Sequence, residues 1–194
     1  VADGPHGLRV VEDALLTAGS EPATCFPPAV TMASSWDEDL IERVGAAVAV
    51  EAQALGAHVV LGPGLNIKRH PRGGRNFEYY SEDPLLSGRF AAAAVRGIQS
   101  QGVGACLKHF AVNNQEGHRF VVDAIVDERT LREIYLSGFE FAIAESKPWT
   151  IMCSYNRLNG EQVSENRLLL TDILRSEWGF DGVVMSDWSA TGDR

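Results

Sequence analysis

The chain has 194 residues, 45% of them hydrophobic, with 17 basic and 26 acidic side chains and a net charge of −9. This balance suits a globular domain with a sizeable core, and it excludes a disordered segment and argues against nucleic-acid or anionic-membrane partners. No apolar stretch approaches the roughly 20 residues of a membrane helix, so we expect a soluble protein, secreted, periplasmic or cytoplasmic.

Apolar runs alternate with helical patterns along the whole chain. In chain order the patterns predict a weak strand at 23–35, a helix at 37–55, a strand at 57–67, a helix at 84–100, a strand at 102–112, a helix at 127–145, a strand at 149–156, a helix at 164–178 and a strand at 182–188. Ser35 or Asp37 is a typical cap for the first helix, and Asp83 before Pro84 for the second. The alternation predicts βα units and a parallel sheet.

The three cysteines are far apart in the sequence. Cys25, Cys106 and Cys153 each lie in or beside an apolar run, and no C-x-x-C spacing is present. We therefore expect three buried free thiols and no cysteine metal site.

Two architectures fit this order of elements: a doubly wound open sheet and a (β/α)8 barrel. The glycine-rich phosphate loops of nucleotide-binding doubly wound folds are missing from the sequence. Hydrogen-bonding and ionisable side chains instead lie at the ends of the apolar runs: Asn66, Arg69, Lys108, His109, Tyr155, Asn156 and Asp187. In a TIM-type barrel the active site is formed by side chains at the carboxyl ends of the strands, which meet at one rim. We therefore predict an α/β TIM-type barrel. A full barrel takes roughly 250 residues, and we expect this chain to hold about five to six βα units.

Lys108 and His109 close the apolar run at 102–112. Two adjacent ionisable groups inside a strand need partners. Either the lysine snorkels and the histidine is a satisfied core residue, or both donate to a polar ligand. Since strand alternation would send the two side chains to opposite faces, we expect at least one to lie where the strand gives way to a loop.

Three polar loops are further candidates for ligand binding. In the loop at 70–84, Arg72 or Arg75 offers a fixed donor fork and Glu78 an acceptor or arginine partner. Asp3 lies in a Pro/Gly turn, where it either makes a local turn hydrogen bond or binds two vicinal hydroxyls. The Asn-rich loop at 113–119 suits hydroxyl recognition or plain solvation equally.

Asp187 ends the last apolar run, with Trp188 beside it. It is either the cap of a following helix or a nucleophile or base on a strand rim, with the indole as an apolar wall. The sequence has no G-x-S-x-G elbow and no H-E-x-x-H metal motif. A donor-rich set of side chains without metal or phosphate motifs suits a neutral, hydroxyl-covered ligand, a sugar, and we predict no metal and no cofactor.

Five motifs occur in order and carry a specific resemblance: DGPHGLR, PRGGRNFEYYSEDP, KHFAVNNQE, MCSYNRLNG and GFDGVVMSDW. Over essentially its whole length the chain resembles the N-terminal barrel of glycoside hydrolase family 3, in its β-glucosidase-like branch. The resemblance implies that Asp187 is the catalytic nucleophile. The residues that it implies for the sugar subsite are Asp3, Arg75, Lys108, His109, Met152 and Tyr155, with Trp188 as an adjacent aromatic and Arg119 as a further contributor.

The resemblance also implies what lies outside residues 1–194. The N-acetylglucosaminidase branch of the family carries a KHFPGHG loop with a catalytic histidine, and KHFAVNNQE in its place disfavours that branch. In the glucosidase-like branch the acid/base glutamate comes from a second domain after the barrel. Glu78, Glu116 and Glu161 match no acid/base context. The chain opens on Val1 rather than methionine, so we expect it to be part of a longer polypeptide and to be inactive alone.

The leading hypothesis is a retaining, exo-acting β-glycosidase, in the first place a β-glucosidase. Its partners would be a β-linked glucoside or oligosaccharide and the rest of the same polypeptide, and its oligomeric state is left open. A β-xylosidase or another exo-β-glycosidase of the family is the alternative within the class. Two alternatives lie outside the glycosidase class: a Schiff-base lyase that uses Lys108, and a non-catalytic carbohydrate-binding fragment.

Overall fold

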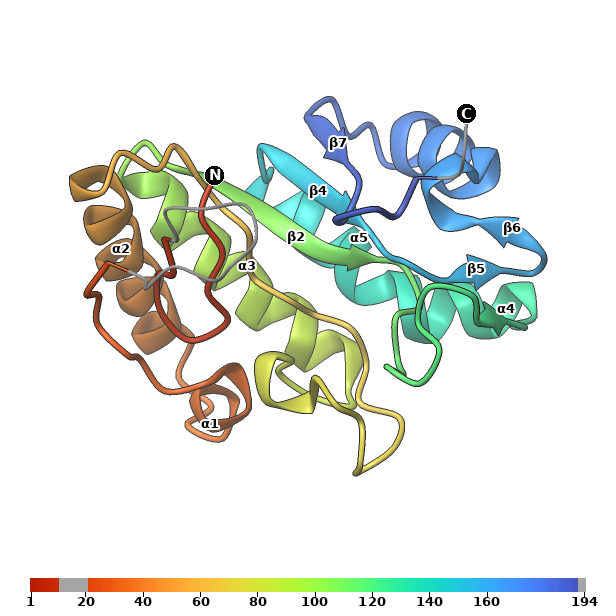
Figure 1. Ribbon diagram of the computed structural model, residues 1–194, viewed down its shortest axis with the longest axis horizontal. Helices are drawn as coiled ribbons and strands as arrows, with labels where there is room; N and C mark the ends of the chain where they lie inside the picture. Colours follow the sequence, from red (N-terminus) through yellow and green to blue (C-terminus); the bar gives the residue numbers. More distant parts are fainter. Residues whose placement is uncertain (11–20, 192–194) are drawn as a thin grey trace.

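The computed structural model describes residues 1–10 and 21–191, and a twisted parallel sheet with helices packed along it organises them (Figure 1). Four strands lie in the order β1 (Val59–Val60), β2 (Gly104–Phe110), β4 (Thr150–Cys153) and β7 (Val183–Met185). Each pairs in parallel with the next. The strands are neighbours in the order of the sequence, with helices between them. This is an arc of an α/β barrel wall, and it confirms the predicted fold class.

The helices match the predicted segments closely. They are α2 (Glu38–Ala54), α3 (Pro84–Ser100), the continuous run of α4 (Glu128–Thr130), a π-helix η2 (Leu131–Leu136) and α5 (Ser137–Ser146), and a π-helix η4 (Leu168–Glu177). Asp37 caps α2 through Leu40 N at 2.9 Å, and Asp83 caps α3 through Leu86 N at 2.7 Å. Both caps satisfy an amide of the first turn, as their positions in the sequence predict.

Smaller elements connect or flank the main sheet. Two 3₁₀ turns are η1 (Asn76–Glu78) and η3 (Val163–Glu165), and a small second sheet holds β3 (Asp123–Ala124), β5 (Arg157–Leu158) and β6 (Glu161–Gln162). The N-terminal segment extends the main sheet, since Ala2 bridges Val60 in parallel. That bridge holds the first residues beside β1 at the edge of the sheet.

Three expectations from the sequence are wrong. The stretch 23–35 forms no strand: it is irregular up to a short helix, α1 (Ala29–Ala33), that follows Pro28. Two consecutive prolines there lack the amide donors that a strand ladder needs. The main sheet of the described residues therefore has four strands and the Ala2 bridge, fewer than five or six units. Cys106 and Cys153 are buried free thiols as expected, but Cys25 is exposed because it lies on this irregular surface segment.

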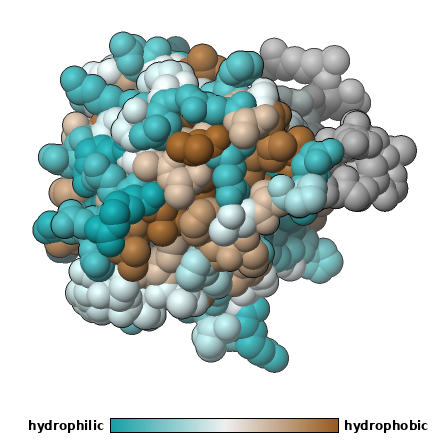
Figure 2. Space-filling view, turned by 90° about the vertical axis from the view of Figure 1, so that its left-hand side faces the viewer, coloured by the Kyte–Doolittle hydropathy of each residue, from teal (hydrophilic) through white to brown (hydrophobic). Residues whose placement is uncertain are grey.

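The core lies between the sheet and its helices. Every residue of β2 and β4 is buried, and Phe110 packs edge-on against Phe139 of α5 at 5.2 Å. Helices α2 and α3 approach closely through two glycines: a Cβ on Gly97 would lie 2.0 Å from the Glu42 carbonyl oxygen, and one on Gly45 would lie 2.7 Å from that of Ala94. The face that carries α1 and α2 shows an apolar patch among hydrophilic side chains (Figure 2). Within the described residues, no helix is both long and apolar enough to cross a membrane.

Candidate active site

One pocket opens where the strands of the main sheet end. It is lined by all nine predicted site residues, namely Asp3, Arg75, Lys108, His109, Arg119, Met152, Tyr155, Asp187 and Trp188, together with Arg9 and Leu61. Strands β2 and β4 and the segments after β1, β4 and β7 each contribute. Because parallel strands bring their carboxyl ends to one rim, residues as distant as Asp3 and Asp187, 184 positions apart in the sequence, meet there.

Asp187 is 7% exposed and is held by two donors. The Tyr155 hydroxyl donates to its Oδ1 at 2.9 Å, and the backbone amide of Trp188 donates to the same oxygen at 2.8 Å. The helix-cap alternative is not supported, because no helix follows Asp187 as far as residue 191, where the described part of the chain ends. The carboxylate is oriented by hydrogen bonds at a pocket wall, which is the arrangement that a nucleophile requires.

His109 is fully enclosed beside the carboxylate. Its Nε2 lies 2.8 Å from Nη2 of Arg75 and 3.7 Å from Oδ2 of Asp187. On the other side of the ring, Nδ1 lies 3.0 Å from the Tyr79 hydroxyl and 3.2 Å from Oδ1 of Asn66. Burial is the largest cause that lowers the pKa of His109 well below its ordinary value, and the charge of Arg75 lowers it further.

Lys108 and Asp3 form the polar floor of the pocket. The Lys108 ammonium lies 2.9 Å from Oδ1 of Asp3 and 3.9 Å from Oε2 of Glu78, and its side chain is only 4% exposed. Arg9 reaches the other oxygen of Asp3 at 3.2 Å, and Arg75 pairs with Glu78. Burial alone would raise the pKa of Asp3, but the charge and hydrogen bond of Lys108 outweigh it and lower that pKa below 3.8.

The side chains of Lys108 and His109 enter the same pocket, although they are neighbours on β2. The pairing of β2 with β4 is irregular between Leu107 and Phe110, where the register shifts. The simple alternation of a regular strand therefore does not apply at this end of β2. The expectation that at least one of the two lies where the strand gives way to a loop is wrong, because β2 continues to Phe110, and both residues line the pocket.

Arg119 and Tyr155 form the opposite wall. The Arg119 guanidinium lies 4.6 Å from the centre of the Tyr155 ring and 5.0 Å from that of Phe120. Glu116 fixes the other end of the guanidinium through an ion pair of 3.0 Å. Burial and the hydrogen bond to Asp187 raise the pKa of Tyr155 to about 12, so its hydroxyl stays a donor at neutral pH.

Several candidates from the sequence lie outside this pocket. Arg72 is exposed on the loop after β1, and Asn113 and Asn156 line a different pocket together with Glu116. Glu161 is exposed in the small sheet.

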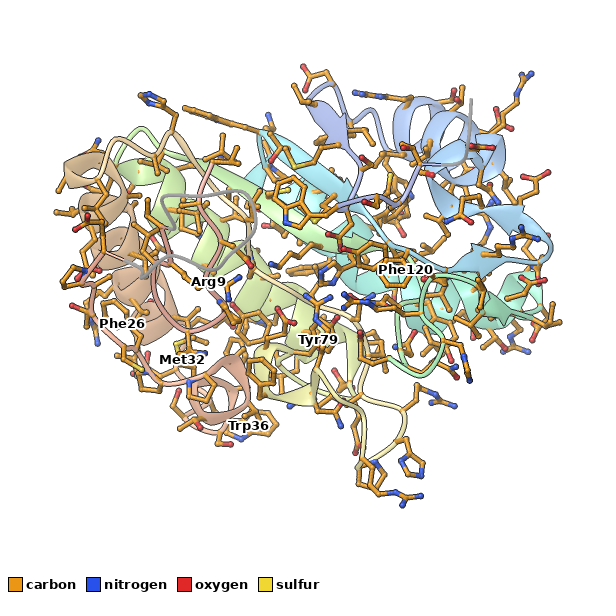
Figure 3. All side chains as sticks on the ribbon, in the orientation of Figure 1. Arg9, Phe26, Met32, Trp36, Tyr79 and Phe120 are labelled. Carbon is orange, nitrogen blue, oxygen red and sulfur yellow. The ribbon has the colours of Figure 1, made fainter. Side chains whose placement is uncertain are left out.

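One supporting residue escaped the sequence reasoning. Tyr79, labelled with Arg9 in Figure 3, is buried and contacts His109. The only signal was its place in the aromatic stretch FEYY, which does not separate a core tyrosine from one that contacts a site residue.

The chemistry of the pocket is that of hydroxyl recognition. Its lining offers four cationic donor groups, a tyrosine and two carboxylates, with an indole at the mouth. Within the described residues, no three His, Cys, Asp or Glu side chains come together as a metal site would need. Fixed donors beside an oriented carboxylate fit a neutral polyhydroxylated ligand that is attacked at a carbon atom.

Comparisons with known proteins bear on the family and the fold of the chain. A family model described as the glycosyl hydrolase family 3 N terminal domain matches residues 11–193. The chain is 60% identical over 197 residues to a thermostable beta-glucosidase B of Acetivibrio thermocellus, covering 100% of this chain and 26% of that protein. It is 56% identical over 200 residues to an exo-alpha-(1->6)-L-arabinopyranosidase of Bifidobacterium longum, with coverages of 100% and 26%.

A solved structure gives the same result for the fold. The beta-glucosidase 3B of Thermotoga neapolitana in complex with glucose superposes with a TM-score of 0.91 at 55% identity, covering 96% of this chain and 26% of that one. The chain thus spans about a quarter of the length of these relatives.

Proposed function

Because the chain belongs to glycosyl hydrolase family 3, we propose that it is part of a retaining, exo-acting β-glycosidase with Asp187 as the nucleophile. The preferred substrate is a terminal, non-reducing β-D-glucosyl residue. The observation that carries the proposal is the hydrogen bonding of Asp187 by Tyr155 and Trp188 at the wall of a donor-rich pocket.

In this mechanism Asp187 attacks the anomeric carbon and forms a covalent glycosyl-enzyme. A second carboxylic acid protonates the departing oxygen and afterwards activates the water that releases the sugar. In retaining enzymes the two carboxyl groups lie about 5–5.5 Å apart. The tyrosine hydroxyl and the backbone amide both donate to Oδ1 and hold the carboxylate in place while its charge decreases.

Asp3 is unsuited to the role of the second acid. A general acid must be protonated at the working pH, whereas the ion pair with Lys108 lowers the pKa of Asp3. Asp3 is the other carboxylate among the residues that line the pocket. We therefore propose that residues 1–194 belong to the catalytic barrel domain and that the acid/base comes from a further domain of the same polypeptide.

The sugar specificity rests on Asp3, Lys108 and Arg75, which would bind hydroxyls of the glycone. A relative that shares 60% identity is named a beta-glucosidase, which favours glucose. Another at 56% is named an exo-alpha-(1->6)-L-arabinopyranosidase, so an α-L-arabinopyranoside is the second candidate, and a β-xyloside the third. A panel of 4-nitrophenyl glycosides of these sugars with the full-length protein separates the three.

The nucleophile is tested by Asp187→Asn in the full-length protein, with Asp181→Asn, at an exposed aspartate before the same strand, as the matched control. We expect at least about a 10³-fold loss of kcat for the first variant, since covalent catalysis is lost, and parent activity for the second. Activity of Asp187→Asn within tenfold of the parent would refute the assignment. Asp187→Gly with added azide should release an α-glycosyl azide, because azide then attacks from the vacated face.

Experiments can distinguish two other functions, a Schiff-base lyase and a non-catalytic sugar-binding protein, from glycoside hydrolysis. A Schiff-base lyase needs a neutral Lys108, and an ammonium paired with Asp3 at 2.9 Å has no free lone pair for a carbonyl. Borohydride with a carbonyl substrate should therefore leave no adduct on Lys108. A non-catalytic sugar-binding protein would bind members of the glycoside panel and hydrolyse none.

A further inference from the structure

Phe120 is an exposed aromatic side chain beside the catalytic pocket. Its ring is 54% exposed and meets the Tyr155 ring edge-on, with 4.6 Å between the ring centres (labelled in Figure 3). Tyr155 is the donor to Asp187, so Phe120 is one contact away from the proposed nucleophile. A half-exposed ring in this place needs a reason beyond core packing.

The position of Phe120 is fixed rather than loose. The Arg119 guanidinium lies 5.0 Å from its ring and 4.6 Å from that of Tyr155, and Glu116 holds Arg119 at 3.0 Å. Cation–π and edge-to-face contacts of this kind orient a ring even at the surface. The free part of the Phe120 ring is therefore a preformed apolar surface.

A second exposed ring stands at the same pocket. Trp188 is 57% exposed, lines the pocket and donates its backbone amide to Asp187. The two groups proposed to bind hydroxyls are by contrast less exposed: Lys108 is buried and Asp3 is half-buried. They lie at the β1 and β2 end of the main sheet, whereas Trp188 follows β7 at the opposite end. Near Asp187 the pocket therefore presents the exposed Trp188 ring, and Phe120 lies beside it against Arg119 and Tyr155.

We infer that Phe120 is a specificity-determining residue that contacts the leaving group of the substrate and favours aromatic or apolar leaving groups. In a retaining hydrolase the leaving group departs on the side of the sugar away from the nucleophile, toward the open mouth. Covering the exposed ring there removes apolar surface from water. The inference rests on the proposed glycosidase function and adds to it the chemical class of the leaving group.

The test compares two glucosides that share a glycone, 4-nitrophenyl and methyl β-D-glucoside, with the full-length protein. We expect Phe120→Ala to lower kcat/KM for the aryl glucoside about tenfold more than for the methyl glucoside, mainly through KM, and Phe120→Trp to restore the ratio. Val121→Ala, at the next residue and 71% exposed, is the matched control and should leave the ratio within about twofold. Phe120→Leu keeps apolar bulk without a ring and replaces Phe120→Ala if that variant fails to fold.

Three outcomes would overturn the inference. An equal loss on both substrates would mean that Phe120 acts only through Tyr155. A similar change of the ratio in Val121→Ala would mean that the loop as a whole is responsible. If neither Phe120→Ala nor Phe120→Leu changes kcat/KM for either substrate, the ring does not touch the leaving group. A parent protein that hydrolyses no member of the glycoside panel refutes the proposed function itself, whereas an active parent with an unchanged ratio refutes this inference alone.

Discussion

Arg75 lies with its Nη2 2.8 Å from Nε2 of His109, and this contact fixes the proton of the imidazole on the opposite nitrogen. A guanidinium only donates hydrogen bonds, so Nε2 must accept and the proton must sit on Nδ1, facing Asn66 and Tyr79. The ring is then neutral. The 3.7 Å approach of His109 to Asp187 is accordingly a contact between a lone pair and a carboxylate, not an ion pair.

The neutral state of His109 predicts a pH dependence of stability. An unfolded histidine binds a proton near pH 6.5, whereas the folded one, with its lowered pKa, does not. As the pH falls below about 6.5 the unfolded state gains protons, so stability drops by up to about 1.4 kcal/mol per pH unit. His109→Gln removes this contribution, and its free energy of unfolding should fall less steeply between about pH 6.5 and 4.5.

Chemical unfolding of the full-length protein at a series of pH values measures that slope. His70→Gln, at an exposed histidine on the loop after β1, is the matched control. A slope for His109→Gln equal to that of the parent would contradict a neutral His109.

The hydroxyl of Tyr155 predicts a selective loss of kcat. A hydrogen bond to a charged group contributes about 1.5–3 kcal/mol, which corresponds to roughly 10–100-fold in rate if the nucleophile loses its orientation. Tyr155→Phe keeps the ring under Arg119, so KM should change by no more than about threefold. Tyr135→Phe, outside the pocket, is the matched control. Steady-state kinetics in which KM alone rises would assign Tyr155 to substrate binding instead.

The sequence predicted the rim of the sheet better than its interior. Lys108, His109 and Asp187 follow apolar runs, and the geometry of parallel strands then requires them to meet. The extent of the strands was overestimated: β1 keeps two residues because Gly62, Pro63 and Gly64 come after only one more residue, Leu61. Length and pairing of a strand depend on its neighbours across the sheet, which a single local pattern does not contain.

The supporting contacts of the site were beyond the sequence for a similar reason. Tyr79 reaches His109 from the loop after β1, and nothing in its spacing singles it out. Phe120 lies next to Arg119 in the chain, but its contact with Tyr155 joins residues 35 positions apart. Side chains that meet through the folding of two loops leave no periodic signal.

The Asp3–Lys108 ion pair predicts a combined effect on binding and stability. Asp3→Asn leaves the buried Lys108 ammonium with Glu78, at 3.9 Å, as its one carboxylate partner within ion-pair distance among residues 1–10 and 21–191. We expect kcat/KM to fall about 10²-fold and stability at pH 7 to fall by about 1–3 kcal/mol. Since the folded pKa of Asp3 is lowered, this stabilisation is present above about pH 3.8 and is lost as the pH falls through the folded value.

Kinetics and thermal unfolding of the full-length Asp3→Asn variant check both effects. Arg9→Gln removes the more exposed partner of Asp3 and serves as the control, with a stability change below about 1 kcal/mol. Parent kcat/KM in Asp3→Asn would exclude Asp3 from the sugar subsite.

The packing of α2 on α3 predicts which glycines tolerate a methyl group. A Cβ on Gly97 would lie 2.0 Å from the Glu42 carbonyl oxygen, a backbone atom that only a shift of the helix can move. Gly97→Ala should therefore lower the free energy of unfolding by about 1–3 kcal/mol, even though alanine is the better helix former. Gly117→Ala is the matched control, because a Cβ there meets nothing within 4 Å. Chemical unfolding of both variants decides the matter: a Gly97→Ala protein as stable as Gly117→Ala would mean that the two helices lie farther apart than the contact at Glu42 requires.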